Sequence, residues 1–121
     1  MERIIGLGGV FIKSQDPKSL AEWYQKHLRI NFNGNTYFNF ENNAATGGSA
    51  VISFFKQDSQ YFNPSGSSFM INLRVKDLKV LFEKLKAEGV TTVGEMMDED
   101  YGKFAWIMDP EGNKIELWQP V

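Results

Sequence analysis

The sequence contains no cysteine, and its single histidine is His27. Without cysteine the chain can form no disulfide, no thiolate nucleophile and no cysteine zinc site. One histidine excludes every metal site that takes two or three imidazoles from the same chain, including the iron site of two histidines and one carboxylate. His27 falls in the predicted first helix, far along the chain from a partner acid, so we expect it to pack at the surface and not to act in catalysis.

An excess of positive charge is also missing, because the sequence has 13 basic and 15 acidic residues and a net charge of −2. Nucleic-acid binding needs a concentrated basic face, so nucleic acid is not an expected partner. No run of about 18 apolar residues occurs, and we therefore expect no membrane span and no membrane partner. The first residues lack a secretory signal pattern, which predicts a cytoplasmic location.

What is present is an ordinary globular composition, with 121 residues of which 42% are hydrophobic. This is enough for one domain with a buried core. The predicted strands are 8–14, 37–41, 50–55, 69–75, 91–93, 104–108 and 114–118. The predicted helices are 17–28, which starts after an Asp-Pro pair, and a second that follows Asp77 and ends near Gly89.

The two predicted helix starts, Asp16 and Asp77, are separated by about half of the chain. When the sequence is aligned with itself at this offset, residues 10–13 align with residues 71–74. We interpret the chain as a duplicated unit of strand, helix and about three strands, and the alternative is two unrelated α+β halves. The predicted single domain 1–121 then consists of a first module (about 1–57), a polar linker (about 58–68) and a second module (about 69–121).

Alternation along the strands predicts which side chains face a cleft between the modules, opposite the helices. If the last hairpin places Trp106 opposite Glu116, the cleft is apolar and aromatic with a few charges, as small-molecule sites are. The candidate ligand-binding residues are Phe11, Lys13, Met70, Asn72, Arg74, Phe104, Trp106 and Trp118.

Each of these candidates has an alternative structural role. The aromatic residues serve equally well as core between sheets or as a dimer interface. Arg74 and Lys13 are either an anion clamp or solvated strand ends, and either can pair with Glu116. Glu116 is the tentative catalytic residue, a base in an apolar cleft, and its alternative is a relic that pairs with Arg74 or Lys114.

The most specific stretch of the sequence is 101–120, whose centre runs from Asp109-Pro110 to Glu116-Leu117. Together with residues 10–24 and 69–89, this stretch resembles the vicinal-oxygen-chelate superfamily, which includes glyoxalase I, bleomycin-resistance proteins and extradiol dioxygenases. It is most similar to the small glyoxalase-like proteins of that superfamily. The resemblance implies an α+β fold of two tandem βαβββ modules, which form a cupped mixed sheet with the helices outside. It also implies a homodimer, the commonest oligomer in general.

Enzymes of this superfamily hold a divalent metal on four side chains, and this sequence matches one of the four positions. Glu116 stands at the position of the last carboxylate ligand. Gly9 stands where His or Gln is usual, and Met70 stands where His is usual. The fourth position falls in the strand around Ser53–Phe55, which has no carboxylate. Glycine offers no donor and a thioether is a soft ligand, so we expect no metal and no other cofactor.

Three functions compete on this evidence. The first is a metal-independent protein that binds a small apolar or aromatic molecule in the cleft. The second is a metal-free lyase or isomerase with Glu116 as base and Arg74 or Lys13 stabilising an oxyanion. The third is a glyoxalase-type lyase that uses Zn²⁺, Ni²⁺ or Mn²⁺, with the missing ligands supplied from elsewhere, such as a partner chain.

Overall fold

The structure, a computed structural model, describes residues 4–41 and 49–121. Its elements, in chain order, are β1 (Ile4–Ser14), α1 (Pro17–Leu28), β2 (Tyr37–Glu41), β3 (Ser49–Lys56), the 3₁₀ turn η1 (Gln60–Phe62), β4 (Phe69–Val75), α2 (Leu78–Ala87), β5 (Met97–Glu99), β6 (Gly102–Met108) and β7 (Lys114–Pro120). No helix within these two stretches has the length and apolar character needed to cross a membrane.

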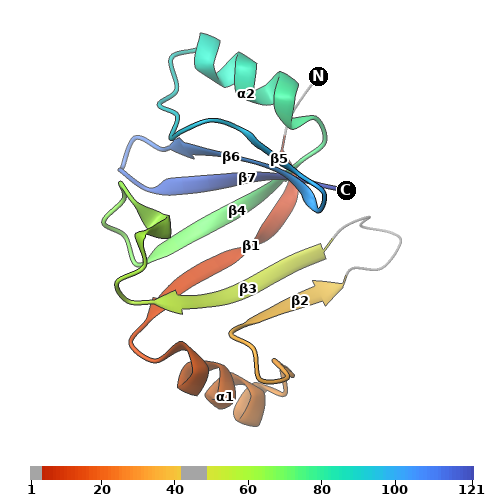
Figure 1. Ribbon diagram of the computed structural model, residues 1–121, viewed down its shortest axis with the longest axis vertical. Helices are drawn as coiled ribbons and strands as arrows, with labels where there is room; N and C mark the ends of the chain where they lie inside the picture. The colour runs from red at the N-terminus through yellow and green to blue at the C-terminus, as the bar shows by residue number, and fades with distance from the viewer. Residues whose placement is uncertain (1–3, 42–48) are drawn as a thin grey trace.

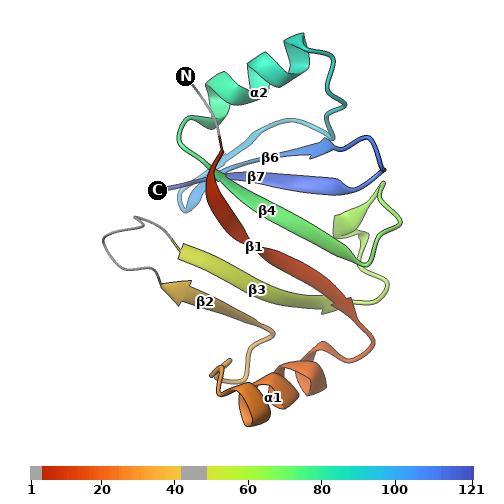
Figure 2. The same ribbon diagram turned by 180° about the vertical axis from the view of Figure 1, so that it is seen from behind.

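All strands belong to one seven-stranded mixed sheet in the order β2-β3-β1-β4-β7-β6-β5. The central pair, β1 and β4, is antiparallel and joins the two halves of the chain. On either side of this pair β1 runs parallel to β3 and β4 runs parallel to β7. Figures 1 and 2 show the helices at opposite ends of the sheet, with α1 beside the first half and α2 beside the second. The predicted α+β architecture with outer helices is confirmed.

The two helices begin in the same way, as the repeat predicted. The side chain of Asp16 accepts a hydrogen bond from Ser19 N at 3.1 Å, and that of Asp77 accepts one from Val80 N at 3.3 Å. These caps satisfy amide groups that have no partner inside the helix. After α2, Gly89 adopts a φ of 85°, a conformation that glycine takes without strain.

The structure differs from the predicted elements in three places. The first strand already begins at Ile4. Thr91–Val93 forms a single bridge, between Thr92 and Ile107, because the regular strand lies further on at Met97–Glu99. This short, exposed strand carries no alternating pattern from which it could be predicted. Within the described residues the first half has two strands after its helix, whereas the second half has three.

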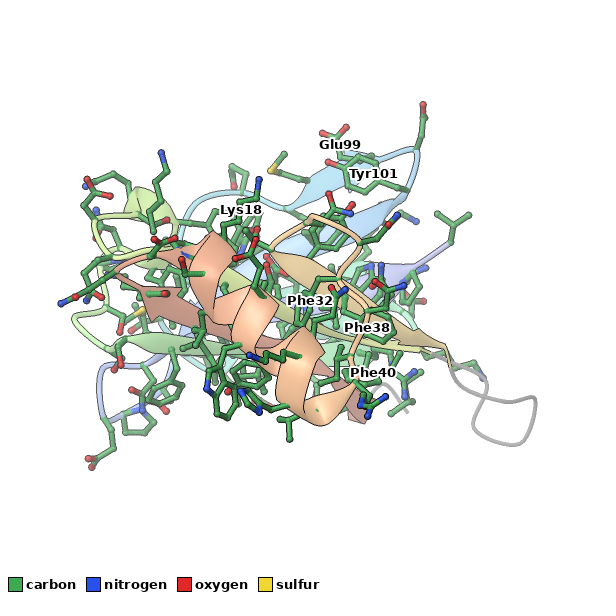
Figure 3. All side chains as sticks on the ribbon, turned by 90° about the horizontal axis from the view of Figure 1, so that it is seen from below. Lys18, Phe32, Phe38, Phe40, Glu99 and Tyr101 are labelled. Atoms are coloured by element: carbon green, nitrogen blue, oxygen red, sulfur yellow. The ribbon has the colours of Figure 1, made fainter. Side chains whose placement is uncertain are left out.

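The helix-bearing face of the sheet holds two separate apolar cores. Under α2 the buried residues are Val75, Leu78, Leu81, Phe82, Ala105 and Leu117. Under α1 they are Ala21, Phe32 and Phe54, with Phe38 and others packed around them. Figure 3 shows Phe32 and Phe38 beside α1. Each helix therefore covers its own module, as the apolar stripes of the two helices predicted.

A third cluster lies on the opposite face of the sheet, which we call the concave face. Its buried members are Phe11, Phe62, Met70 and Trp106. Phe62 comes from η1, within the stretch expected to be a polar linker, and is 0% exposed. The linker is therefore part of the core, and its aromatic side chain fills the centre of the expected cleft.

The loop between β6 and β7 is built on Asp109, whose carboxylate accepts hydrogen bonds from Glu111 N and Asn113 N, both at 2.9 Å. The side chain of Asn113 in turn accepts a hydrogen bond from Ser67 Oγ at 2.7 Å. The loop motif that stands out in the sequence thus also fastens the linker to the second module.

Replacement of Phe62 by alanine tests whether the linker contributes to the core. We expect Phe62→Ala to lower the free energy of unfolding by about 3–5 kcal/mol, because a fully buried ring is lost. The matched control is Phe40→Ala, since Phe40 is 41% exposed on β2, and it should lose less than about 1 kcal/mol. Chemical denaturation of both variants measures the difference, and equal losses would contradict the assignment.

Candidate functional site

The β6–β7 hairpin arranges six concave-face side chains in three cross-strand pairs. The register places Phe104 opposite Trp118, Trp106 opposite Glu116 and Met108 opposite Lys114. The rings of Phe104 and Trp118 are stacked, with centroids 6.3 Å apart and planes inclined by 3°. The condition on which the sequence-based site depended, Trp106 opposite Glu116, is therefore met.

The central strands contribute the remaining predicted residues to the same region. Phe11 and Met70 face each other across β1 and β4 and are buried in the concave-face cluster. Lys13 places its Nζ 5.1 Å from the centre of the Phe62 ring. Arg74 is buried on β4, next in the sheet to Trp118. The structure thus brings the predicted residues to one face but packs several of them against each other.

Glu116 is the centre of the site, because its buried carboxylate accepts hydrogen bonds from three neutral side chains. Asn72 Nδ2 donates to Oε1 at 2.6 Å, Trp106 Nε1 donates to Oε2 at 2.9 Å, and the hydroxyl of Tyr61 also donates to Oε2. Glu116 itself is 2% exposed. A carboxylate at this depth needs such donors, since an unpaired buried charge is strongly destabilising.

Tyr61 is a site residue that the sequence analysis missed. It lies in η1 and stacks on Phe55, with ring centroids 5.6 Å apart and planes inclined by 11°. Its ring meets Trp106 edge-on at 6.2 Å. The available signal was the pair Tyr61-Phe62 within an otherwise polar stretch, which is unusual for a solvated linker.

Lys114, considered before only as a partner for Glu116, also belongs to the site. Its Nζ donates to the main-chain oxygen of Tyr61 at 2.7 Å and lies 5.6 Å from the centre of the Trp106 ring. Burial lowers the pKa of Lys114 from its ordinary value of 10.5, and the negative charge of Glu116 opposes that shift. The ammonium group of Lys114, which lies on β7, therefore holds η1 through the main-chain oxygen of Tyr61.

Among the described residues, two buried polar atoms of the site, Asn72 Oδ1 and Trp118 Nε1, have no hydrogen-bond partner. Both side chains lie against Gly8, where an added Cβ would stand 1.8 Å from Asn72 Oδ1 and 3.0 Å from the Trp118 ring. Glycine is therefore required at this position by close packing.

The residues at the superfamily's metal positions do not fit a divalent metal. An added Cβ at Gly9 would stand 2.1 Å from the main-chain oxygen of Val51, so no larger side chain reaches inward from there. Met70 is 0% exposed and packed among aromatic rings. Both oxygens of Glu116 already accept hydrogen bonds. Within residues 4–41 and 49–121, no group of three or more His, Asp or Glu side chains is placed to hold a metal.

A shallow hollow of about 510 Å³ lies at the start of α1 and is lined by residues such as Ser19, Trp23 and Tyr24. The centre of the concave face, where the sequence predicts a cleft, is filled by Phe62 and its neighbours. Its rim stays accessible, because Tyr61 is 39% exposed and Tyr101 is 67% exposed. His27 is exposed on α1, and its ring lies against that of Trp23 with centroids 4.9 Å apart and planes inclined by 44°.

The ionisation of Tyr61 offers a direct test of this geometry. Burial, and then the negative charge of Glu116, raise the pKa of Tyr61 above its ordinary value of 10.0. Because the folded state holds this proton more tightly, the contribution of Tyr61 to stability should be lost as the pH rises above the ordinary value. The difference in phenolate absorbance between wild type and Tyr61→Phe should show a transition above the ordinary range. A difference spectrum that titrates at the ordinary value would contradict the Tyr61–Glu116 contact.

Comparison with known proteins agrees with the fold and the motif. Solved structures with the same fold include methylmalonyl-CoA epimerase from Mycobacterium tuberculosis, with 23% identity, a TM-score of 0.62, and coverage of 98% of this chain and 89% of that chain. Methylmalonyl-CoA epimerase from Streptomyces coelicolor, in complex with 2-nitronate-propionyl-CoA, gives 13% identity, a TM-score of 0.74, and coverage of 98% and 99%.

A glyoxalase/bleomycin resistance protein/dioxygenase superfamily member from Vibrio splendidus gives 12% identity, a TM-score of 0.61, and coverage of 98% and 99%. These identities show the fold alone. A comparison with curated proteins gave no match. The profile of the glyoxalase-like domain matches residues 9–118. With nearly the whole chain matched, the protein belongs to the glyoxalase-like domain family.

Proposed function

We propose that this protein binds a small apolar or aromatic molecule on its concave face without a metal ion. The observation that carries the proposal is the aromatic surface around Glu116. Phe104 and Trp118 form a stacked, half-buried pair beside Trp106, and Tyr61 covers the carboxylate. Flat ring faces next to a few fixed polar groups are the usual composition of a small-molecule site.

Two features support a ligand at the rim of the concave face and not at its centre. The centre is packed, since Phe62 and Met70 are both 0% exposed. At the rim, the ring centroids of Tyr101 and Phe104 lie 5.7 Å apart, and the Phe104 and Trp118 rings are partly exposed. A planar molecule placed there would cover exposed aromatic surface and contact the partly exposed rings of Phe104 and Trp118.

A catalytic role for Glu116 is a weaker alternative. A general base must come within hydrogen-bond reach of a substrate proton. Glu116 is 2% exposed, and both of its oxygens already accept hydrogen bonds, one of them from the partly exposed Tyr61. Catalysis would therefore require Tyr61 to move first, whereas binding at the rim does not.

The homodimer also remains a proposal, and the sheet offers a surface for it. On the helix-bearing face, β1 and β4 cross the middle of the sheet with no helix over them (Figure 2). Leu7 and Phe69, which point to this face, are 50% and 42% exposed. Association of two copies through this strip would bury apolar surface that the helices leave open.

The proposal predicts weak metal binding. Titration of the purified protein with Ni²⁺, Zn²⁺ and Mn²⁺ in a calorimeter should give no tight stoichiometric site, because Glu116 is the one carboxylate at the superfamily positions. Glu116→Gln serves as the control and should leave the heat signal unchanged. A tight site that disappears in this variant would instead favour the metal-dependent lyase.

The aromatic rim can be tested with naphthalene as a probe, monitored by tryptophan fluorescence. We expect wild type to bind it and Phe104→Ala to bind it about threefold to tenfold more weakly, because one aromatic contact is lost. Phe69→Ala removes an exposed ring from the opposite face and should bind like wild type. Absence of binding to wild type, or equal weakening in both variants, would count against the proposed site.

A further inference from the structure

The ring of Tyr61 is held by contacts that surround it as a binding site surrounds an aromatic ligand. Phe55 stacks on it at 5.6 Å, and Trp106 meets it edge-on at 6.2 Å. The Nζ of Lys114 lies 5.2 Å from the ring centre, which is within the range of a cation–π interaction. One stacked ring, one perpendicular ring and one cation thus contact the same phenol side chain.

The hydroxyl of Tyr61 completes this arrangement by donating a hydrogen bond to Glu116. The other donors to Glu116, Asn72 and Trp106, come from β4 and β6 and do not depend on the tyrosine side chain. Lys114 holds η1 by the main-chain oxygen of Tyr61. Rotation of the Tyr61 side chain therefore leaves both the carboxylate and the fold of η1 in place.

The two aromatic residues of η1 differ sharply in burial. Phe62 is 0% exposed and anchors the turn in the core, whereas Tyr61 is 39% exposed. The open side of the Tyr61 ring is accessible from solvent. A ligand can therefore reach the Tyr61 position without displacing Phe62 or unfolding the linker.

We propose that Tyr61 is an internal stand-in for a ligand, and that this ligand is a phenol that takes its place on Glu116. The inference goes beyond the proposed function, because the phenol displaces the Tyr61 side chain, whereas a molecule at the Phe104–Trp118 rim does not. The free energies of the two states are nearly equal, because the ligand's hydrogen bond to Glu116 replaces that of Tyr61. The ligand's contacts with Phe55 and Trp106 likewise replace those of the Tyr61 ring. The apparent affinity is then reduced by the fraction of time that Tyr61 occupies the site.

The surroundings also determine which form of a phenol can bind. Burial and the charge of Glu116 raise the pKa of Tyr61, so the position favours a neutral phenol over a phenolate. The other ionisable groups near Tyr61 are Lys114, Tyr101 between β5 and β6, and Lys13 over the adjacent Phe62 ring. A phenol should therefore stop binding when the pH exceeds its own pKa.

The test uses p-cresol, which has the side chain of tyrosine, and toluene, which lacks the hydroxyl. We expect Tyr61→Ala to bind p-cresol at least about tenfold more tightly than wild type does, and to bind toluene at least about tenfold more weakly than p-cresol. The matched control is Tyr37→Ala, because Tyr37 is 48% exposed on β2; it should show no gain. Glu116→Gln, combined with Tyr61→Ala, should reduce the preference for p-cresol.

A second measurement separates displacement in wild type from simple filling of the hole in the variant. With carbon-13 at Cζ of tyrosine, the Tyr61 resonance, assigned with Tyr61→Phe, should move towards that of a solvated tyrosine when unlabelled p-cresol is added. Toluene should leave it in place. An unmoved resonance at p-cresol saturation, or equal affinities for p-cresol and toluene in Tyr61→Ala, overturns the inference.

The two proposals can fail separately. If naphthalene binds and responds to Phe104→Ala while the Tyr61 resonance ignores p-cresol, the aromatic site stands and the phenol assignment is wrong. If neither naphthalene nor p-cresol binds to wild type or to Tyr61→Ala, the proposed function itself is wrong.

Discussion

The structure depends on how the buried carboxylate of Glu116 is satisfied. A charge removed from water is tolerated only when hydrogen bonds replace its hydration. Here the donors come from three different elements, since Tyr61 lies in η1, Asn72 in β4 and Trp106 in β6. One side chain on β7 therefore determines the position of the linker and of two strands. Phe62 adds the apolar anchor that keeps η1 over the sheet.

This arrangement differs from the metal site that the resemblance to the superfamily implies. The concave face keeps the carboxylate at the last ligand position, but the other positions have become backbone packing at Gly9 and apolar packing at Met70. The space between the modules holds aromatic rings. The same fold thus presents a hydrogen-bond acceptor within an aromatic wall, where a metalloenzyme of the superfamily presents an ion. This difference is the physical basis of the binding function that we propose.

Much of the fold was predictable because it follows from local rules. Asp16 and Asp77 begin helices because their side chains satisfy free helix amides, and the apolar stripes that follow must be buried. Alternation in β4, β6 and β7 assigned side chains to the correct faces. The strand Met97–Glu99 was not predictable in this way, because its three residues are exposed and follow no apolar alternation, and it forms only by pairing with β6.

The sequence by itself determined the two-module architecture, the faces of the strands and the position of Glu116 opposite Trp106. These depend on periodicity and on a short hairpin, whose register is set within a few residues. Only the tertiary structure decided that the concave face is filled, that Tyr61 covers Glu116 and that Lys114 holds η1. These contacts join residues about 50 positions apart. No local pattern encodes such contacts, because they arise when a buried charge and an apolar surface find partners in whatever segment the fold brings near.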